Sequence, residues 1–190
     1  MEQEIIHAVE VLRNGGIILY PTDTIWGIGC DARNAEAVER LYAIKERDRS
    51  KSMLVLVRNC RLSRRYTTEF GIRNYGERPT TYILPREIWH DGMHLEVADN
   101  LPAEDGTLGV RCPRHHFCQE VLRRLGAPLV STSANFSGRP SPQTYDEIGE
   151  DLKRRVDYCV APLAEFLSGE TRGSRIVKVN PDGSQTVLRP

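Results

Sequence analysis

Hydrophobic residues recur along this chain with two spacings, one typical of helices and one typical of strands. Apolar residues three to four positions apart predict one-sided helices, and short β-branched or apolar runs predict buried strands. Three of the predicted helices are Glu4–Arg13, Phe117–Leu125 and Thr144–Val156. A fourth is expected to follow an N-cap at Asn34 and to carry Val38, Leu41 and Tyr42 on its apolar stripe. The predicted strands are Ile17–Tyr20, Met53–Val57, Thr80–Leu84, Leu108–Arg111, Pro128–Ser131, Tyr158–Val160, Arg175–Val179 and Thr186–Leu188. This alternation predicts an α/β fold, a single-domain twisted mixed β-sheet with flanking helices.

Local signals mark some of the boundaries between these elements. Gly15–Gly16 is expected to end the first helix as a left-handed cap and turn, and Gly126 to end the third. Thr144–Glu147 fits a capping box that opens the fourth helix. Cys60–Tyr75 is interpreted as a helix with exposed arginines, whereas Pro85–Gly106 shows no periodicity and is expected to wander over the surface. The apolar face of the first helix is expected to comprise Ile5, Ile6, Val9 and Leu12.

Length and composition limit the class of protein. A chain of 190 residues with 39% hydrophobic residues is long enough for a sizeable core and fits one domain over residues 1–190. The first 13 residues carry acids among their apolar residues, unlike a signal peptide, and no apolar run reaches membrane-spanning length. The five cysteines are widely spread and form no CxxC pair, which is typical of reduced thiols. We therefore expect a cytoplasmic protein without a membrane segment.

Positive charge is concentrated in one part of a chain whose net charge is zero. Between Arg40 and Arg65 there are nine Lys and Arg residues and two acids, whereas residues 85–107 hold six acids and one Arg. In an extended segment, cations at every second position lie on one side, where they suit a polyanion. The spacing also fits a solvated charge run, and by itself it leaves both interpretations open. The cations with this spacing are Lys45, Arg47, Arg49 and Lys51.

Polar side chains follow two of the predicted strands. Pro21–Thr24 leaves the strand Ile17–Tyr20 with two hydroxyls and a carboxylate, and Ser131–Asn135 leaves the strand Pro128–Ser131 with four polar side chains. Loops at strand ends commonly carry ligand-binding groups. The alternative for each is an ordinary turn whose side chains bond to their own backbone.

Several well-known catalytic and binding motifs are missing from the sequence. It contains no GxxxxGK[ST] phosphate loop, no GxGxxG after a strand and no GxSxG nucleophile turn. Four possible zinc ligands do occur within seven residues, but they lack the paired short spacings of structural zinc sites, and a strand-to-helix corner explains them without metal. We therefore expect no structural metal at Cys112, His115, His116 and Cys118.

Four stretches, taken together and in this order, resemble the YrdC/Sua5 family of L-threonylcarbamoyladenylate synthases. They are YPTDTIWGIGCDA (Tyr20–Ala32), Lys45-Glu46-Arg47 with Lys51, GTLGVRCPRHH (Gly106–His116) and STSANFSGRPSP (Ser131–Pro142). Ser174 and the terminal Leu188–Pro190 also look like the family's closing elements, so the resemblance covers nearly the whole chain. It implies a YrdC/RibB-like fold and the short, stand-alone form of the family.

The resemblance implies a nucleotidyltransferase that joins L-threonine, bicarbonate or CO2, and ATP into threonylcarbamoyl-AMP, with release of pyrophosphate. This is the first step of the t6A modification of tRNA. The threonine amine captures CO2 as a carbamate, whose oxygen attacks the α-phosphate, so no protein nucleophile is needed. Mg2+ is expected to enter with ATP and not at a dedicated protein site. The implied partners are tRNA or the downstream threonylcarbamoyl-transferase machinery.

The resemblance also implies roles for individual residues. Lys45 and Arg47 are expected to be catalytic. The residues expected to bind ATP are Lys45, Arg47, Lys51, Thr81, Ser133, Asn135, Arg139 and Arg189; those expected to hold threonine are Thr24, Arg111 and Ser174. The chain departs from the family pattern at Asp48, at Lys51-Ser52-Met53 and at Gly76–Pro79, where the family commonly has proline-containing steps. These departures leave the outline of the ATP loop open.

Two other functions remain alternatives. One is a module that binds double-stranded RNA or tRNA through a basic concavity, although a net charge of zero argues against it. The other is a paralogue with a different carbamoyl or nucleotidyl chemistry, for which the carbamoyl-transferring hydrogenase-maturation proteins are the nearest example. Such paralogues can lack the Lys-x-Arg and Ser-x-Asn pairs, and both pairs are present here as Lys45/Arg47 and Ser133/Asn135.

Overall fold

The structure is a computed structural model that describes residues 1–48, 53–59, 78–166 and 172–190. In these residues nine strands form one sheet, in the order β7-β1-β2-β6-β3-β5-β4-β8-β9. The pairs β1–β7, β3–β5 and β4–β8 are parallel and the other neighbours are antiparallel, so the predicted mixed α/β sheet is confirmed. That residues 1–190 form a single domain stays a prediction. The strands are β1 (Ile18–Tyr20), β2 (Gly27–Gly29), β3 (Leu54–Leu56), β4 (Thr80–Leu84), β5 (Leu108–Arg111), β6 (Leu129–Ser133), β7 (Tyr158–Cys159), β8 (Arg175–Val179) and β9 (Gln185–Arg189).

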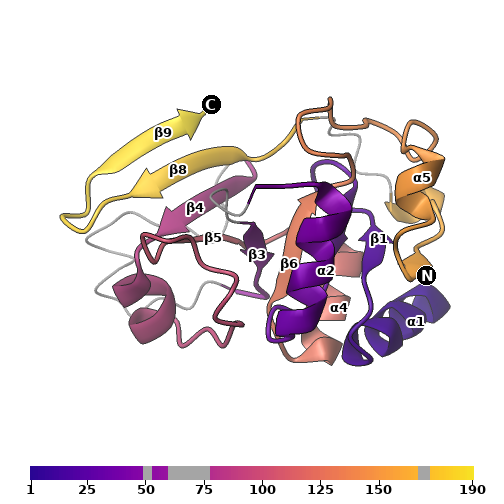
Figure 1. Cartoon of the computed structure of the whole chain (residues 1–190), viewed down its shortest axis with the longest axis horizontal. Helices are drawn as coiled ribbons and strands as arrows, with labels where there is room; N and C mark the ends of the chain where they lie inside the picture. The colour runs from indigo at the N-terminus through magenta and orange to yellow at the C-terminus, as the bar shows by residue number, and fades with distance from the viewer. Residues whose placement is uncertain (49–52, 60–77, 167–171) are drawn as a thin grey trace.

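Helices cover both faces of this sheet. Figure 1 shows α2 in front of β6 and α4 behind it, and α1 packs against α4. One hydrophobic core therefore lies between the sheet and α2, and a second lies between the sheet, α1 and α4. None of the described helices is long and apolar enough to cross a membrane. The helices are α1 (Glu2–Arg13), α2 (Ala35–Lys45), α4 (His116–Leu125), α5 (Glu150–Lys153) and the short η1 (Glu87–Gly92) and η2 (Ala164–Phe166).

The alternation of side chains along β4 and β5 leaves one part of the sheet free of helices. Leu108 and Val110 of β5 belong to the core beneath α2, so Gly109 and Arg111 face the opposite side of the sheet. Thr81 of β4 lies on that same side. The core formed with α1 and α4 includes no described residue of β4, β5 or β8, so these helices leave this half of the face uncovered.

Most of the predicted elements are confirmed. The bounds of β4, β5 and β8 are those expected from their β-branched and apolar runs. Asn34 caps α2, because its side chain accepts the N–H of Ala37 at 3.0 Å. Helix α4 ends at Gly126, which adopts the expected left-handed conformation with φ of 70°.

The first helix differs from its prediction in where it starts and which face it buries. It begins at Glu2 and is followed by Asn14, and the left-handed residue is Gly15, with φ of 77°. Ile6 is 40% exposed, so its assignment to the buried face is wrong. The stripe that packs against the sheet has the i, i+3, i+4, i+7 spacing of a single helical face: Ile5, Ala8, Val9 and Leu12.

The helix predicted over Thr144–Val156 is the largest correction. Helix α5 spans only Glu150–Lys153, and the residues before it form turns. The carboxylate of Glu147 does reach back, but it accepts the N–H of Gln143 at 2.8 Å and not that of Thr144. The capping-box pattern therefore stabilises a turn here.

The segment Pro85–Gly106 does not wander over the surface as predicted. Within it η1 buries Trp89, which is 2% exposed and whose indole N–H donates to the carbonyl of Gly106 at 3.0 Å. Leu101 is also fully buried. The segment contributes to the core without a helical or strand period, which is why its pattern was missed. The helix predicted over Cys60–Tyr75 lies outside the described residues.

Strand β6 is longer than predicted. Ser133 and Thr132 pair with Gly27 and Ile28 of β2, so the first three residues of the polar run, Ser131–Ser133, belong to the strand. Hydrogen bonds to β2 keep this polar end of β6 in the extended conformation, although its side chains are not apolar. The hydroxyls of this run are thereby held at known positions on the sheet.

Candidate active site

A cavity of about 230 Å³ lies on the uncovered part of the sheet. We call it the central cavity. Its walls come from segments that are far apart in sequence, namely the loop between β1 and β2, the chain just after α2, and strands β3 to β6, β8 and β9. None of the described residues that line it is an Asp or a Glu. The predicted site residues among its lining are Thr24, Arg47, Thr81, Arg111, Ser133, Ser174 and Arg189.

Other predicted site residues do not reach this cavity. Lys45, Asn135 and Arg139 are described but are not part of its lining. Lys51 lies outside the described residues. That these residues bind ATP therefore stays a prediction.

One end of the central cavity is built around a buried arginine. Arg111 is 4% exposed, and its guanidinium donates to the hydroxyl of Thr24 at 2.8 Å and to the carboxylate of Asp23 at 3.1 Å. Asp23 also accepts the main-chain N–H of Arg114 at 3.0 Å, which holds the carboxylate in place. The Nε of Arg111 is buried and has no hydrogen-bond partner among the described residues. A buried guanidinium with a spare donor, next to a hydroxyl, suits a carboxylate ligand.

The loop before this arginine combines both interpretations made from its sequence. The hydroxyl of Thr22 accepts the N–H of Thr24 at 3.0 Å and donates to the carbonyl of Ile25 at 2.8 Å, as in an ordinary polar turn. Asp23 and Thr24 nevertheless point to Arg111 and hold it at the cavity. The turn is therefore the support of a ligand-binding wall.

A pair of hydroxyls forms another wall. Thr81 of β4 and Ser174, just before β8, are both buried, and their hydroxyl oxygens lie 2.7 Å apart. The guanidinium of Arg189 reaches back from β9 and donates to the carbonyl of Ser174 from Nε at 2.8 Å and from Nη2 at 2.6 Å. A Cβ on Gly173 would lie 2.9 Å from Nη2 of Arg189, so a larger residue at this position would make the guanidinium shift. Partial burial lowers the pKa of Arg189, but an arginine remains charged at neutral pH.

The segment Lys45–Arg47 does not have the extended conformation that its spacing predicts. Lys45 is the last residue of α2, and Glu46 is left-handed, with φ of 50° and ψ of 42°. The N–H groups of Glu46 and Arg47 bond to the carbonyls of Ala43 and Tyr42 at 3.2 and 3.3 Å, the pattern of a Schellman helix end. This turn directs Lys45 into the protein and leaves Arg47 in the cavity wall.

Burial changes the charge expected for Lys45. Its side chain is 1% exposed, and this burial, together with the nearby charge of Arg47, lowers the pKa of Lys45 to about 7. The prediction that Lys45 lies with three other cations on one side of an extended segment is wrong, because Lys45 ends a helix and its side chain is buried. Arg49 and Lys51 lie outside the described residues.

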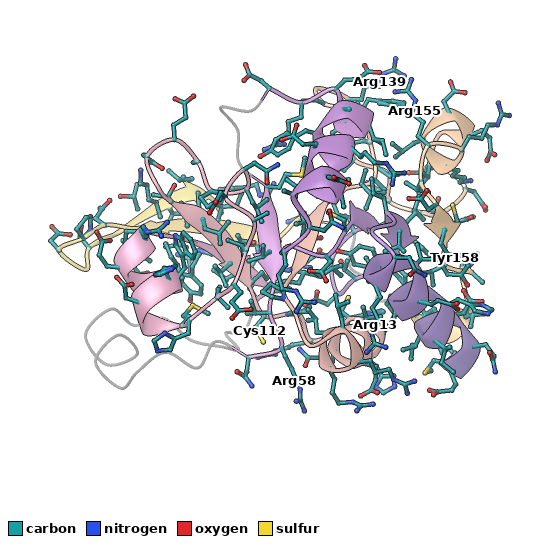
Figure 2. All side chains as sticks on the ribbon, turned by 60° about the horizontal axis from the view of Figure 1, so that its bottom comes forward. Arg13, Arg58, Cys112, Arg139, Arg155 and Tyr158 are labelled. Carbon is teal, nitrogen blue, oxygen red and sulfur yellow. The ribbon has the colours of Figure 1, made fainter. Side chains whose placement is uncertain are left out.

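Ser133, the last residue of β6, lies in the cavity wall, whereas Arg139 in the segment that follows does not. The guanidinium of Arg139 lies 5.6 Å from the ring centre of Phe136, and that of Arg155 lies 5.0 Å from the same ring. Figure 2 shows Arg139 and Arg155 close together at one end of the molecule. Arg139 is exposed and stacks on an aromatic ring, so it is not part of the cavity wall.

Reasoning from the sequence missed the apolar part of the wall. Ile83 was assigned only to a strand, yet it shares a face of β4 with Thr81 and lines the cavity with it. The period of two along β4 was the signal that could have found it. The other apolar residues in the wall are Ile25, Trp26, Met53, Leu54 and Ile176.

Three of the four cysteines and histidines at the connection from β5 into α4 have other partners. Cys112 donates to the carbonyl of Arg58 at 3.1 Å, and these two residues lie together in Figure 2. Cys118 donates to the carbonyl of Pro21 at 3.4 Å, and Nε2 of His115 lies 2.9 Å from the carbonyl oxygen of Phe166. No group of three possible metal ligands occurs among the described residues. That these residues bind no structural metal stays a prediction.

Comparison with known proteins identifies the family of this chain. A family model described as "Telomere recombination", for Sua5, YciO and YrdC, matches residues 10–190. A relative named threonylcarbamoyl-AMP synthase, from Pseudomonas aeruginosa, is 34% identical over 184 residues, which cover 89% of this chain and 89% of that protein.

Solved structures have the same fold. The crystal structure of E. coli YciO has a TM-score of 0.76 at 25% identity, with 100% of this chain and 89% of that chain covered. The crystal structure of P. abyssi Sua5 complexed with L-threonine has a TM-score of 0.75 at 22% identity, and this chain spans 54% of its length. With a family model that matches almost the entire chain, the protein belongs to the Sua5/YciO/YrdC family.

Proposed function

We propose that this protein is a threonylcarbamoyl-AMP synthase, a nucleotidyltransferase that uses L-threonine, bicarbonate or CO2, and ATP and releases pyrophosphate. Its relatives over most of the chain carry this name. The observation that carries the proposal is Arg111, a buried arginine in the cavity wall whose Nε has no partner among the described residues and which Thr24 and Asp23 hold in place. A substrate with a carboxylate would satisfy it.

The residues of the central cavity wall suit the two organic substrates. Arg111 and Thr24 supply a guanidinium and a hydroxyl for the carboxylate of threonine, and Ser174 is also part of the cavity wall. Arg47 and Arg189 supply charge for the phosphates of ATP. The hydroxyls of Thr81 and Ser133, also in the cavity wall, supply further hydrogen-bonding partners.

These groups can promote the reaction without a protein nucleophile. The threonine amine attacks CO2 and releases a proton, which gives a carbamate. A carbamate oxygen then attacks the α-phosphorus, the bond from that phosphorus to the bridging oxygen breaks, and pyrophosphate leaves with the bond's electron pair. Arginines aimed at the phosphates stabilise the charge that develops there, and the cavity holds the two reactants together.

Mg2+ is proposed to arrive as the complex with ATP. Since no described residue of the cavity wall is a carboxylate, the phosphates and water would be its ligands, as is common for Mg2+ bound with a nucleotide. The hydroxyls of Thr81 and Ser133 fit this arrangement because they can bond to the phosphates or to water on the ion. We also propose that the product passes to tRNA, directly or through a transferase partner, in the cytoplasm.

The test is the release of pyrophosphate in the presence of Mg2+ and ATP. Release is expected to require both L-threonine and bicarbonate, because the attacking carbamate forms only from the two together. A threonine-dependent adduct of AMP should appear at the same rate by mass spectrometry. Release that is the same without threonine would contradict the proposal and favour another nucleotide chemistry.

L-Serine is expected to be a poorer but detectable substrate. It lacks only a methyl group, and one methyl group in an apolar pocket is worth about 1 to 3 kcal/mol, or about 5- to 150-fold in kcat/KM. The apolar residues in the cavity wall, Leu54, Ile83 and Ile176, provide the contacts that this methyl group would lose. The measurement is kcat/KM for the two amino acids at saturating ATP and bicarbonate, and equal values would show that the side chain is not held in the cavity.

A further inference from the structure

Three hydrogen bonds converge on the buried ammonium group of Lys45. Its Nζ donates to the carbonyl of Ser133 at 2.6 Å, to the side-chain oxygen of Asn135 at 3.0 Å and to the carbonyl of Asn135. A lysine ammonium has three N–H donors. Every donor of Lys45 is therefore used by the turn that follows β6, and the side chain is 1% exposed.

Lys45 and Arg47 point to different places because Glu46 between them is left-handed. Arg47 lines the central cavity, whereas Lys45 lies behind it. A phosphate group could reach Nζ of Lys45 only if the ammonium released one of its three acceptors and the turn moved aside. Lys45 and Arg47, which have the same expected role from the sequence, therefore have different surroundings in the structure.

The end of α2 holds the same turn through its main chain as well. The N–H of Ser137 donates to the carbonyl of Lys45 at 2.9 Å. Within the turn, the hydroxyl of Ser133 donates to the side-chain oxygen of Asn135 at 2.5 Å, so this oxygen accepts from both Lys45 and Ser133. Ser133 also lines the central cavity. The orientation of its side chain is therefore linked to Lys45 through Asn135.

We infer that Lys45 is a positioning residue, which acts on the nucleotide only through Ser133 and Asn135, while Arg47 contacts the nucleotide itself. This inference rests on the proposed function for the identity of the substrate. It assigns to Lys45 a role different from the direct ATP contact that the resemblance implies. The inference also says that Lys45 fixes the position of residues 133–137, and this part does not depend on the identity of the substrate.

The kinetic test is a double-mutant cycle with Lys45→Met and Asn135→Ala, read as kcat/KM for ATP. Each single change is expected to lower kcat/KM by about a hundredfold, because both leave Ser133 unsupported. The double variant should be no more than about threefold worse than the poorer single variant, since both changes break one linked unit. Losses that multiply, to about ten-thousandfold, would overturn the inference and show that Lys45 acts on ATP independently.

A matched control removes an exposed cation by the same substitution. Arg154→Met takes away a side chain that is 75% exposed and that forms an ion pair with Asp151 at 3.9 Å. It is expected to stay within about threefold of the parent in kcat/KM. A loss at Arg154 as large as that at Lys45 would mean that overall charge, and not the turn, governs the rate.

Crystal structures give a second test that does not need activity. Without ligands, Lys45→Met is expected to show residues 133–137 displaced, and an unmoved turn would overturn the inference. In the unaltered protein with a non-hydrolysable ATP analogue, Nζ of Lys45 should keep its bonds to the two carbonyls, and a phosphate oxygen bonded to Nζ would also overturn it. This complex decides the matter if Lys45→Met does not fold. If the unaltered protein releases no pyrophosphate with threonine and bicarbonate, the proposed function fails, whereas the position of the turn in Lys45→Met still tests the role of Lys45.

Discussion

Replacing Arg47 by alanine is expected to lower kcat/KM for ATP by about a hundredfold or more, the usual effect of losing one charged contact to a transition state. Arg47 lines the central cavity at the end of the left-handed turn at Glu46, and no carboxylate among the described residues of the wall competes with a phosphate for it. Burial lowers the pKa of Arg47, yet a guanidinium remains charged near neutral pH. The fold should be little affected, so the melting temperature of Arg47→Ala serves as the check on its structure.

Two further variants make this prediction specific. Arg47→Lys should restore only part of the loss, because a guanidinium grips phosphate oxygens through two parallel N–H bonds and an ammonium does not. Arg58→Ala removes an exposed arginine that Figure 2 shows at the end of the molecule opposite Arg139, and it should stay within about threefold of the parent. Equal losses at Arg47 and Arg58 would mean that the summed charge matters and that Arg47 has no individual role.

The variant Gly29→Ala is expected to lose about 3 kcal/mol or more in the free energy of unfolding, at the upper end of what overpacking a core costs. Gly29 lies in β2, and a Cβ there would be 1.8 Å from the carbonyl oxygen and 3.0 Å from the carbonyl carbon of Val130. Val130 is fully buried in β6, where the ladder with β3 holds its main chain. Neither strand can move without disturbing the middle of the sheet, so the clash cannot be relieved by turning a side chain.

The measurement is urea denaturation of Gly29→Ala beside a control glycine. A Cβ on Gly149 would meet nothing within 4 Å, and this residue has φ of −57°, which any amino acid adopts. Gly149→Ala is therefore expected to change the free energy of unfolding by less than about 0.5 kcal/mol. Similar values for the two variants would show that β2 and β6 are not as close as described.

The strands with a clear local pattern were predictable because their own residues specify them. Thr80–Leu84 and Arg175–Val179 are rich in β-branched residues that favour the extended chain, and both strands have the predicted bounds. Helix α4 was predictable because Gly126 supplies a left-handed end without a steric cost. In each case the decisive interactions lie within the element itself.

Elements whose ends depend on distant residues were not predictable in the same way. The end of α2 has Glu46 in a left-handed conformation that usually requires glycine, so the sequence shows no stop signal there. The acceptors for Lys45 lie 88 and 90 residues further along the chain. The spacing of Lys45 and Arg47 was consistent with an extended segment, and only the turn after β6 shows that Lys45 points inward.

The sequence by itself determined the alternation of helices and strands, the family resemblance and the identity of several polar and charged residues in the cavity wall, because motifs are local and collinear. The tertiary structure decided which of these residues meet. Arg111 reaches Thr24 across 87 residues, and Thr81 reaches Ser174 across 93. It also separated Arg47 in the wall from Lys45 behind it. A cation can contact a ligand only if its N–H donors are not already bonded within the protein. The donors of Lys45 are bonded to Ser133 and Asn135, because the end of β6 packs against the end of α2.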